Sequence, residues 1–98
     1  GRNWQQSDYD KAKRAVESID GVDFNGPGQG MFNLDFVIEN YQTPSEITRT
    51  KIDLEQGLKD VGFYPESVDV KSDYAGAMNP QLMMQVNFGD NPYERDTQ

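Results

Sequence analysis

The sequence predicts an α+β fold of two helices and a four-stranded, mainly antiparallel sheet, on three observations. In two segments apolar residues recur at a spacing of three and four, the pattern of an amphipathic helix. In four other segments they alternate with polar residues, which is typical of strands with one buried face. The segments follow one another in the order helix, strand, strand, and this order occurs twice.

The first helix is expected at residues 7–20. Its apolar face consists of Tyr9, Ala12, Ala15, Val16 and Ile19. Ser7 followed by Asp10 forms a short version of the capping box that begins many helices. Gly21 suits the left-handed position that commonly follows a helix, so the sequence predicts both ends.

A hairpin is expected after this helix. Its first strand is short, with Val22 and Phe24 on one face, and its second covers about residues 31–40. The buried face of the second strand consists of Phe32, Leu34, Phe36 and Ile38. Residues 26–30, Gly-Pro-Gly-Gln-Gly, are interpreted as the turn rather than as a phosphate-binding loop, because such loops open a helix and these glycines lead into a strand.

The second helix begins at the strongest local signal in the chain. Thr43 is expected at the N-cap, Pro44 at the first helical position and Glu46 where its carboxylate reaches back to the cap. The expected core face is Ile47, the stem of Lys51, Leu54, Leu58 and Val61, flanked by Ile52, and the helix ends before Gly62. Gly57 weakens a helix, and a close approach of helix to sheet is its expected compensation.

A second hairpin completes the pattern, with strands at residues 67–71 and 81–88. Its buried face includes Leu82, Met84, Val86 and Phe88. The chain is therefore interpreted as two αββ repeats, about 7–40 and 43–89, forming a two-layer sandwich with both helices on one face. The two longest strands, 31–40 and 81–88, are expected to pair at the centre with the short strands at the edges. This arrangement resembles a circularly permuted ferredoxin-like fold.

One domain is expected at residues 7–89, because 98 residues support a single small core. Residues 1–6 and 90–98 are expected to be a flexible N-terminal segment and a flexible C-terminal tail. Each contains one large aromatic residue, Trp4 or Tyr93, which either folds back on the domain or contacts another chain. With no long apolar run and no signal-like segment, a soluble, cytoplasmic protein without membrane contact is expected.

The composition disfavours several classes of function. The chain has no histidine and no cysteine, which removes the usual general base, the thiolate nucleophile and the common transition-metal ligands. Its 17 acidic and 9 basic residues give a net charge of −8, which repels nucleic acid. Calcium suits acidic chains, but the best loop match, residues 21–26, lacks the dominant carboxylates. The sequence therefore predicts no metal, no cofactor and no nucleic-acid partner.

Carboxylates are the remaining side chains that could catalyse a reaction or bind a small molecule. Asp35, Glu39 and Asp69 are expected on the exposed side of the sheet, where they are candidates for a small-molecule or enzymatic site formed at a subunit interface. Alternating charges on an open sheet face are also the ordinary expectation. Since an uncovered sheet provides no water-excluding pocket, the sequence favours a protein without catalytic activity.

The same outward face suggests an interaction surface. Val37 and Met83 are apolar there, and the neutral amides Asn33, Gln85 and Asn87 surround them without the desolvation cost of charge. Isolated apolar residues on a surface need no explanation, so both interpretations stay open. The predicted function is a non-catalytic module that acts by protein–protein contact, as a homo-oligomer or a subunit of a larger assembly. The candidate contact residues are Val37, Met83, Asn33, Gln85, Asn87, Trp4 and Tyr93.

Overall fold

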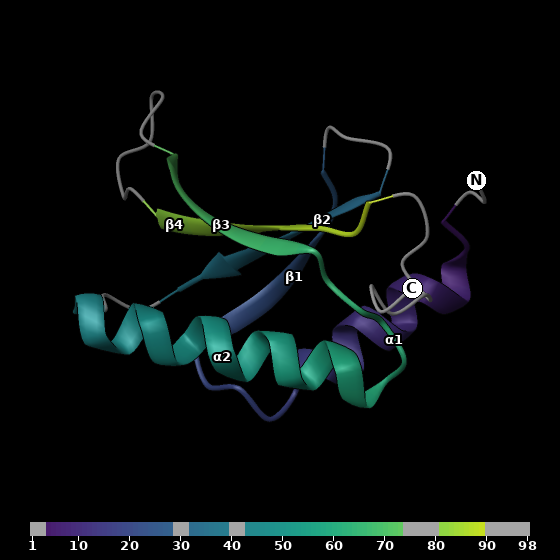
Figure 1. Ribbon diagram of the computed structural model, residues 1–98, viewed down its shortest axis with the longest axis horizontal. Helices are drawn as coiled ribbons and strands as arrows, with labels where there is room; N and C mark the ends of the chain where they lie inside the picture. Colours follow the sequence, from purple (N-terminus) through teal and green to yellow (C-terminus); the bar gives the residue numbers. More distant parts are fainter. Residues whose placement is uncertain (1–3, 29–31, 40–42, 74–80, 90–98) are drawn as a thin grey trace.

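A computed structural model of the chain describes residues 4–28, 32–39, 43–73 and 81–89. Its elements are, in chain order, α1 (Gln6–Val16), β1 (Val22–Pro27), β2 (Asn33–Ile38), α2 (Pro44–Asp60), β3 (Ser67–Asp73) and β4 (Gln81–Asn87). The strands form one layer, and both helices lie on the same side of it (Figure 1). The predicted α+β class, with two helices and a four-stranded sheet, is confirmed.

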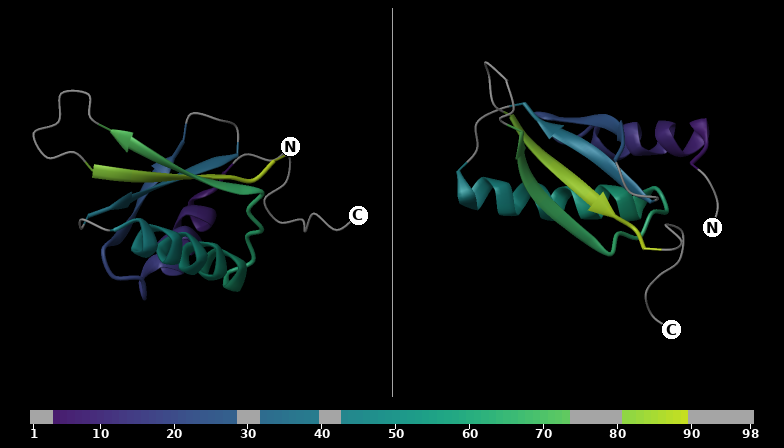
Figure 2. Two further views of the ribbon diagram at one scale, coloured as in Figure 1. Left: turned by 60° about the vertical axis from the view of Figure 1, so that its left-hand side comes forward. Right: turned by 90° about the horizontal axis from the view of Figure 1, so that it is seen from above.

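The sheet has the strand order β1-β2-β4-β3, and each neighbouring pair is antiparallel. The predicted pairing of the second strand of each hairpin at the centre is therefore confirmed (Figure 2). In the centre, Leu34 faces Val86 and Phe36 faces Met84. The edge strands are longer than predicted, with six residues in β1 and seven in β3.

The core lies between the sheet and the helices. Its fully or nearly buried apolar residues include Ala12, Ala15, Val16, Phe32, Leu34, Phe36, Ile38, Leu54, Leu58, Met84, Val86 and Phe88. The predicted buried face of β2 is confirmed at every position. On the predicted buried face of the last strand, Met84, Val86 and Phe88 are buried, and Leu82, near the start of β4, is half-buried. Hydrophobic burial on one face of each strand thus specifies which side of the sheet the helices cover.

Helix α1 differs from the prediction at both ends. Its N-cap is Gln5, whose backbone N–H donates to Asp8 Oδ2 at 2.8 Å, so the capping box lies two residues before the expected one. At the other end the chain leaves the helix after Val16. The N–H of Ile19 then donates to the Val16 carbonyl at 3.0 Å, a tighter turn than an α-helix makes. Ile19 consequently packs on the core from a turn rather than from the helix.

Strand β1 continues through part of the segment predicted as a turn. The hairpin itself is confirmed, because β1 pairs antiparallel with β2 and the pairing reaches Pro27 opposite Leu34. The register shifts between Phe24 and Pro27, and Gly26 adopts a φ of 95°, which favours glycine. Gly26 and Pro27 therefore end an irregular strand, and residues 29–30 of the predicted turn lie outside the described residues.

Helix α2 begins as predicted. The Thr43 N–H donates to Glu46 Oε1 at 2.8 Å, and the Glu46 N–H donates to Thr43 Oγ1 at 3.3 Å. Ile52 does not flank the core as expected, since it is 55% exposed and lies about 160° around the helix from buried Leu54.

The explanation predicted for Gly57 is also wrong. A Cβ at this position would collide with the backbone carbonyl oxygen of Ala15. Gly57 therefore permits a close approach of α2 to α1, rather than to the sheet.

Candidate functional site

The side of the sheet opposite the helices, here called the open face, brings together side chains from all four strands. Strand register arranges them in rows: Asn33, Asn87 and Ser67; Asp35, Gln85 and Asp69; and Asp23, Val37, Met83 and Lys71. Five of the seven predicted contact residues therefore lie together on β2 and β4, the two central strands. They are Asn33, Val37, Met83, Gln85 and Asn87.

The row through Val37 and Met83, here called the central row, combines an apolar centre with charged ends. Val37 and Met83 face each other across β2 and β4, and both are half-buried by their neighbours on the sheet. Asp23 on β1 and Lys71 on β3 are exposed and lie at opposite ends of the row. An apolar contact between two open faces would therefore be bordered by charge at both edge strands.

Hydrogen bonds between β3 and β4 orient the polar side chains. Lys71 Nζ donates to Gln85 Oε1 at 2.9 Å. Asn87 Nδ2 donates to Asp69 Oδ2 at 3.0 Å and to Ser67 Oγ at 3.1 Å. These contacts use both N–H donors of the Asn87 amide and one acceptor position of Gln85 Oε1, so they leave Asn87 Oδ1 and Gln85 Nε2 for a partner.

Asp35 is a residue of the open face whose carboxylate has a buried oxygen atom. Its Oδ1 is buried and finds no hydrogen-bond partner within the part of the chain that the structure describes. The backbone at Gly28 lies over it, since a Cβ there would be 2.9 Å from Asp35 Oδ1 and 3.2 Å from Gln85 Nε2. Any larger residue than glycine at this position would have to displace one of these side chains.

The three predicted carboxylates do not form one site. Asp35 and Asp69 both lie opposite Gln85, on its two sides, whereas Glu39 is exposed beyond the end of β2. Among the described residues, no group of three acidic, histidine or cysteine side chains is placed to hold a metal ion. Residues 22–26 of the segment that was compared with a calcium loop lie on strand β1 instead of in a loop.

Trp4 packs on its own domain. Its ring meets those of Phe32, Phe63 and Phe88 edge to face, with centroid distances of 5.9, 5.8 and 5.7 Å. Trp4 is half-buried, so its packing joins the predicted N-terminal segment to one end of the core. The other aromatic contact candidate, Tyr93, lies outside the described residues.

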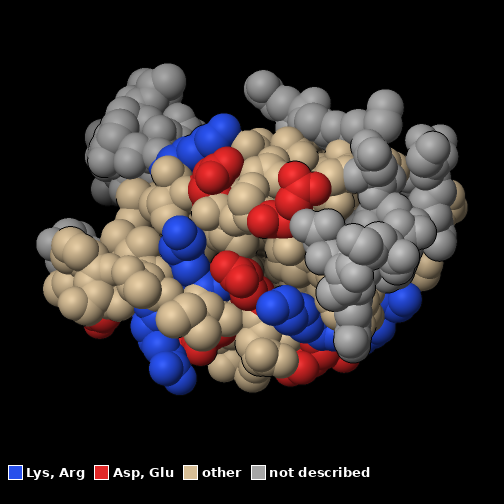
Figure 3. Space-filling model, in the orientation of Figure 1, with Lys and Arg blue, Asp and Glu red and all other residues tan. Residues whose placement is uncertain are grey.

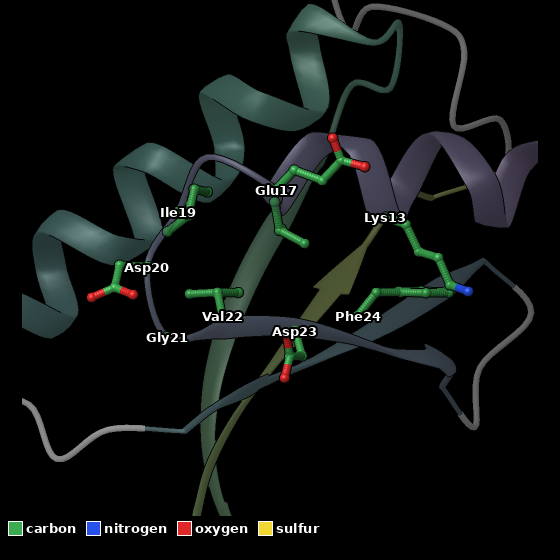
Figure 4. A pocket seen from close by; sticks show the side chains of 9 residues that line it. Lys13, Glu17, Ile19, Asp20, Gly21, Val22, Asp23 and Phe24 are labelled. Atoms are coloured by element: carbon green, nitrogen blue, oxygen red, sulfur yellow. The ribbon is translucent and has the colours of Figure 1, made fainter.

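A pocket of about 570 Å³ lies between the end of α1 and the beginning of β1 (Figure 4). Ile19, Val22 and Phe24 contribute apolar surface, and the Lys13 side chain extends alongside Phe24. Glu17 and Asp20 point away from one another, so the pocket has no convergent set of ionisable groups. The sequence did not indicate this pocket, because it exists where α1 ends earlier than the periodicity suggests.

On the face shown in Figure 3, the described residues add no second concentrated site. Acidic and basic side chains are interspersed over the face shown in Figure 3. Across the described ranges, no helix has both the length and the apolar character needed to cross a membrane.

Geometry therefore identifies the open face, with Val37 and Met83 at its centre, as the strongest candidate site. Comparison of the chain with protein-family models, with curated proteins and with solved structures finds no match to any of them.

Proposed function

We propose that this chain is a non-catalytic module that acts through protein–protein contact, by self-association or as a subunit of a larger assembly, with the open face as its contact surface. The observation that carries the proposal is the pairing of Val37 with Met83 on the two central strands, on the side that neither helix covers. Covering these side chains removes apolar surface from water, which is the main driving force of association.

The distribution of polar groups around this pair supports the proposal. Specific interfaces have a centre depleted in charge and a polar rim. On the open face the neutral amides Asn33, Gln85 and Asn87 lie on the central strands, and the exposed charges of Asp23 and Lys71 lie on the edge strands. Asp35 is the exception, and Gly28 partly covers its carboxylate.

The same proposal includes the finer description of the fold. Each helix precedes an antiparallel pair of strands, and the second strand of each pair, β2 or β4, lies at the centre of the sheet. This symmetry supports two αββ repeats joined through β2 and β4, in an arrangement related to the ferredoxin-like fold by circular permutation.

The test is sedimentation of the wild-type chain and Met83→Lys over a wide range of concentrations. We expect the wild type to associate and Met83→Lys to associate more weakly, because an ammonium group at the centre of the open-face contact would be desolvated without a partner. The matched control is Ile52→Lys, which makes a similar change on the exposed face of α2, away from the sheet, and should associate like the wild type. A wild-type monomer at every concentration, with Met83→Lys indistinguishable from it, contradicts self-association through the open face.

A second candidate function, a small-molecule site between subunits, is supported by one observation, the unpartnered Oδ1 of Asp35. Asp69 lies on the other side of Gln85 and would contribute a second carboxylate. An organic ligand or metal ion found between subunits in a crystal, in contact with Asp35 or Asp69, would favour this function over the first.

A further inference from the structure

The two edges of the sheet differ in how well they are protected against another strand. Natural edge strands are usually protected by bulges, prolines or charged side chains, because an open edge invites pairing, and the charges of β3 include those of Asp69 and Lys71. Strand β1 has such protection, with a register shift and Pro27 at its end. Strand β3 pairs regularly with β4 over all seven residues and contains no proline. Figure 2 shows β3 along the outer side of the sheet, opposite β1.

The hydrogen bonds of the sheet show which backbone groups β3 presents at this edge. Phe88 N–H donates to the Phe32 carbonyl at 3.0 Å, so even-numbered residues of β4 point toward β2 and odd-numbered ones toward β3. The register pairs Asp69 with Gln85, which makes the odd-numbered residues of β3 those that bond to β4. The N–H and C=O groups of Val68, Val70 and Ser72 therefore point outward, where no described strand pairs with them.

The side chains at the middle of β3 also suit a partner strand. Val70 faces the helix side of the sheet, because its partner on β4 is the buried Met84, yet Val70 itself is 38% exposed. It is one of two large apolar residues exposed to this degree in the described part of the chain. Asp69 and Lys71 flank it on the open face with opposite charges.

We propose that β3 pairs antiparallel with β3 of a second copy of this chain, about a two-fold axis at Val70. The inference rests on the proposed self-association, and it adds a contact at the edge of the sheet to the contact on the open face. Val70 then lies opposite Val70 of the second copy, in a pair that exchanges both backbone hydrogen bonds. Val68 lies opposite the second copy's Ser72 and adds further backbone bonds on each side of the axis.

Charge makes this register self-complementary. Asp69 faces Lys71 of the second copy, and Lys71 faces its Asp69, in pairs where the Cα atoms are only about 4.5 Å apart. Opposite charges directly across two strands stabilise the pairing, whereas like charges oppose it. The sequence Asp69-Val70-Lys71 therefore recognises its own antiparallel copy. The product is one eight-stranded sheet with a continuous open face, an interface of the isologous type.

The test uses two charge variants, Asp69→Lys and Lys71→Asp, studied separately and as an equimolar mixture by sedimentation. In each single variant both cross-strand pairs become like-charged, so we expect the dissociation constant to rise by about tenfold or more. In the mixture, two lysines of one variant face two aspartates of the other, so we expect a heterodimer to form. Recovery on mixing also shows that each variant is folded.

The matched controls are Lys13→Asp and Asp20→Lys. They make the same two charge changes at exposed residues beside β1, the opposite edge of the sheet, so association should persist. Hydrogen exchange provides a second readout, since the Val70 amide should become protected as the protein concentration rises.

Three results would overturn the inference: a wild-type chain that stays monomeric, charge variants that associate as the wild type does, or variants that fail to associate when mixed. If the charge variants associate normally and Met83→Lys does not, the edge contact is wrong and the open face remains the contact surface. A different result is that each charge variant alone stays monomeric, their mixture associates, and Met83→Lys associates like the wild type. In that case β3 is the contact surface and the open face is not.

Discussion

Gly57 determines how closely the two helices can approach on their common side of the sheet. The carbonyl oxygen of Ala15 occupies the space where a Cβ at residue 57 would lie. Ala15 is itself nearly buried, with an exposed fraction of 6%, so α1 cannot easily move away at this point. A residue that is unfavourable for helix formation is therefore required by a tertiary contact.

Gly57→Ala should destabilise the protein by about 1–3 kcal/mol, the usual cost of overpacking a close contact. Helix propensity alone predicts the opposite, a gain of up to about 1 kcal/mol. Urea unfolding measures the difference, with Gln56→Ala as the control, because residue 56 lies on the exposed side of the same turn. A stabilised Gly57→Ala variant would show that the helices do not touch there.

The beginning of α2 shows how an element is specified by a few adjacent residues. The Thr43 backbone N–H donates to the Glu46 carboxylate, and this bond is the largest cause of a pKa of Glu46 below its ordinary value. A hydrogen bond with the Thr43 side chain is the second cause. Both bonds favour the ionised form, and the positive end of the helix dipole acts in the same direction. The capping box therefore stabilises the folded chain when Glu46 is charged.

This coupling gives a pH dependence of known sign. Because the pKa of Glu46 is lower in the folded chain, its ionisation stabilises the fold above the ordinary glutamate pKa, and this contribution is lost as pH falls through the lowered value. Glu46→Gln keeps a capping side chain without the charge. The wild type should be more stable than Glu46→Gln at pH 7, with the difference shrinking under acid. A difference independent of pH would contradict the assignment.

The elements that the sequence predicted correctly are those specified locally. The box at Thr43 and the alternation in β2 depend on neighbours within a few residues, and both are found in the structure. The start of α1 was misplaced because Gln5 is an uncommon N-cap and Ser7 a common one. The role of Gly57 depends on Ala15, 42 positions away, and no local pattern contains that contact.

The candidate site also has some features that local sequence patterns predict and others that depend on distant parts of the chain. Alternation placed Val37 and Met83 on the open face, and the predicted central pairing brought them together. The cover of Gly28 over Asp35 depends on a β1 strand longer than predicted. The exposure of Val70 depends on where the helices end relative to the edge of the sheet, which periodicity does not specify.

At the scale of the whole molecule, a net charge of −8 opposes any contact between two copies. The two shorter dimensions of the chain are 26 and 23 Å, so the centres of two touching copies lie about 25 Å apart. Without screening, their charges would repel by about 11 kcal/mol in water. At 0.01 M salt the Debye length is about 30 Å, and a little under half of this repulsion energy remains. At 0.15 M salt the Debye length is about 8 Å, and less than a tenth of the repulsion energy remains.

Added salt should therefore strengthen self-association. It relieves about 4 kcal/mol of repulsion between these two concentrations, whereas two exposed Asp69–Lys71 pairs lose at most about 2 kcal/mol. We expect the dissociation constant, measured by sedimentation, to fall at least about tenfold from 0.01 to 0.15 M NaCl. An increase with salt would instead mean that local ion pairs outweigh the net charge. Lys71→Asp distinguishes the net-charge repulsion from the ion pairs, because it makes each copy more acidic and removes both Asp69–Lys71 pairs. Its association should be weaker than that of the wild type, and its dissociation constant should fall more steeply as salt is added.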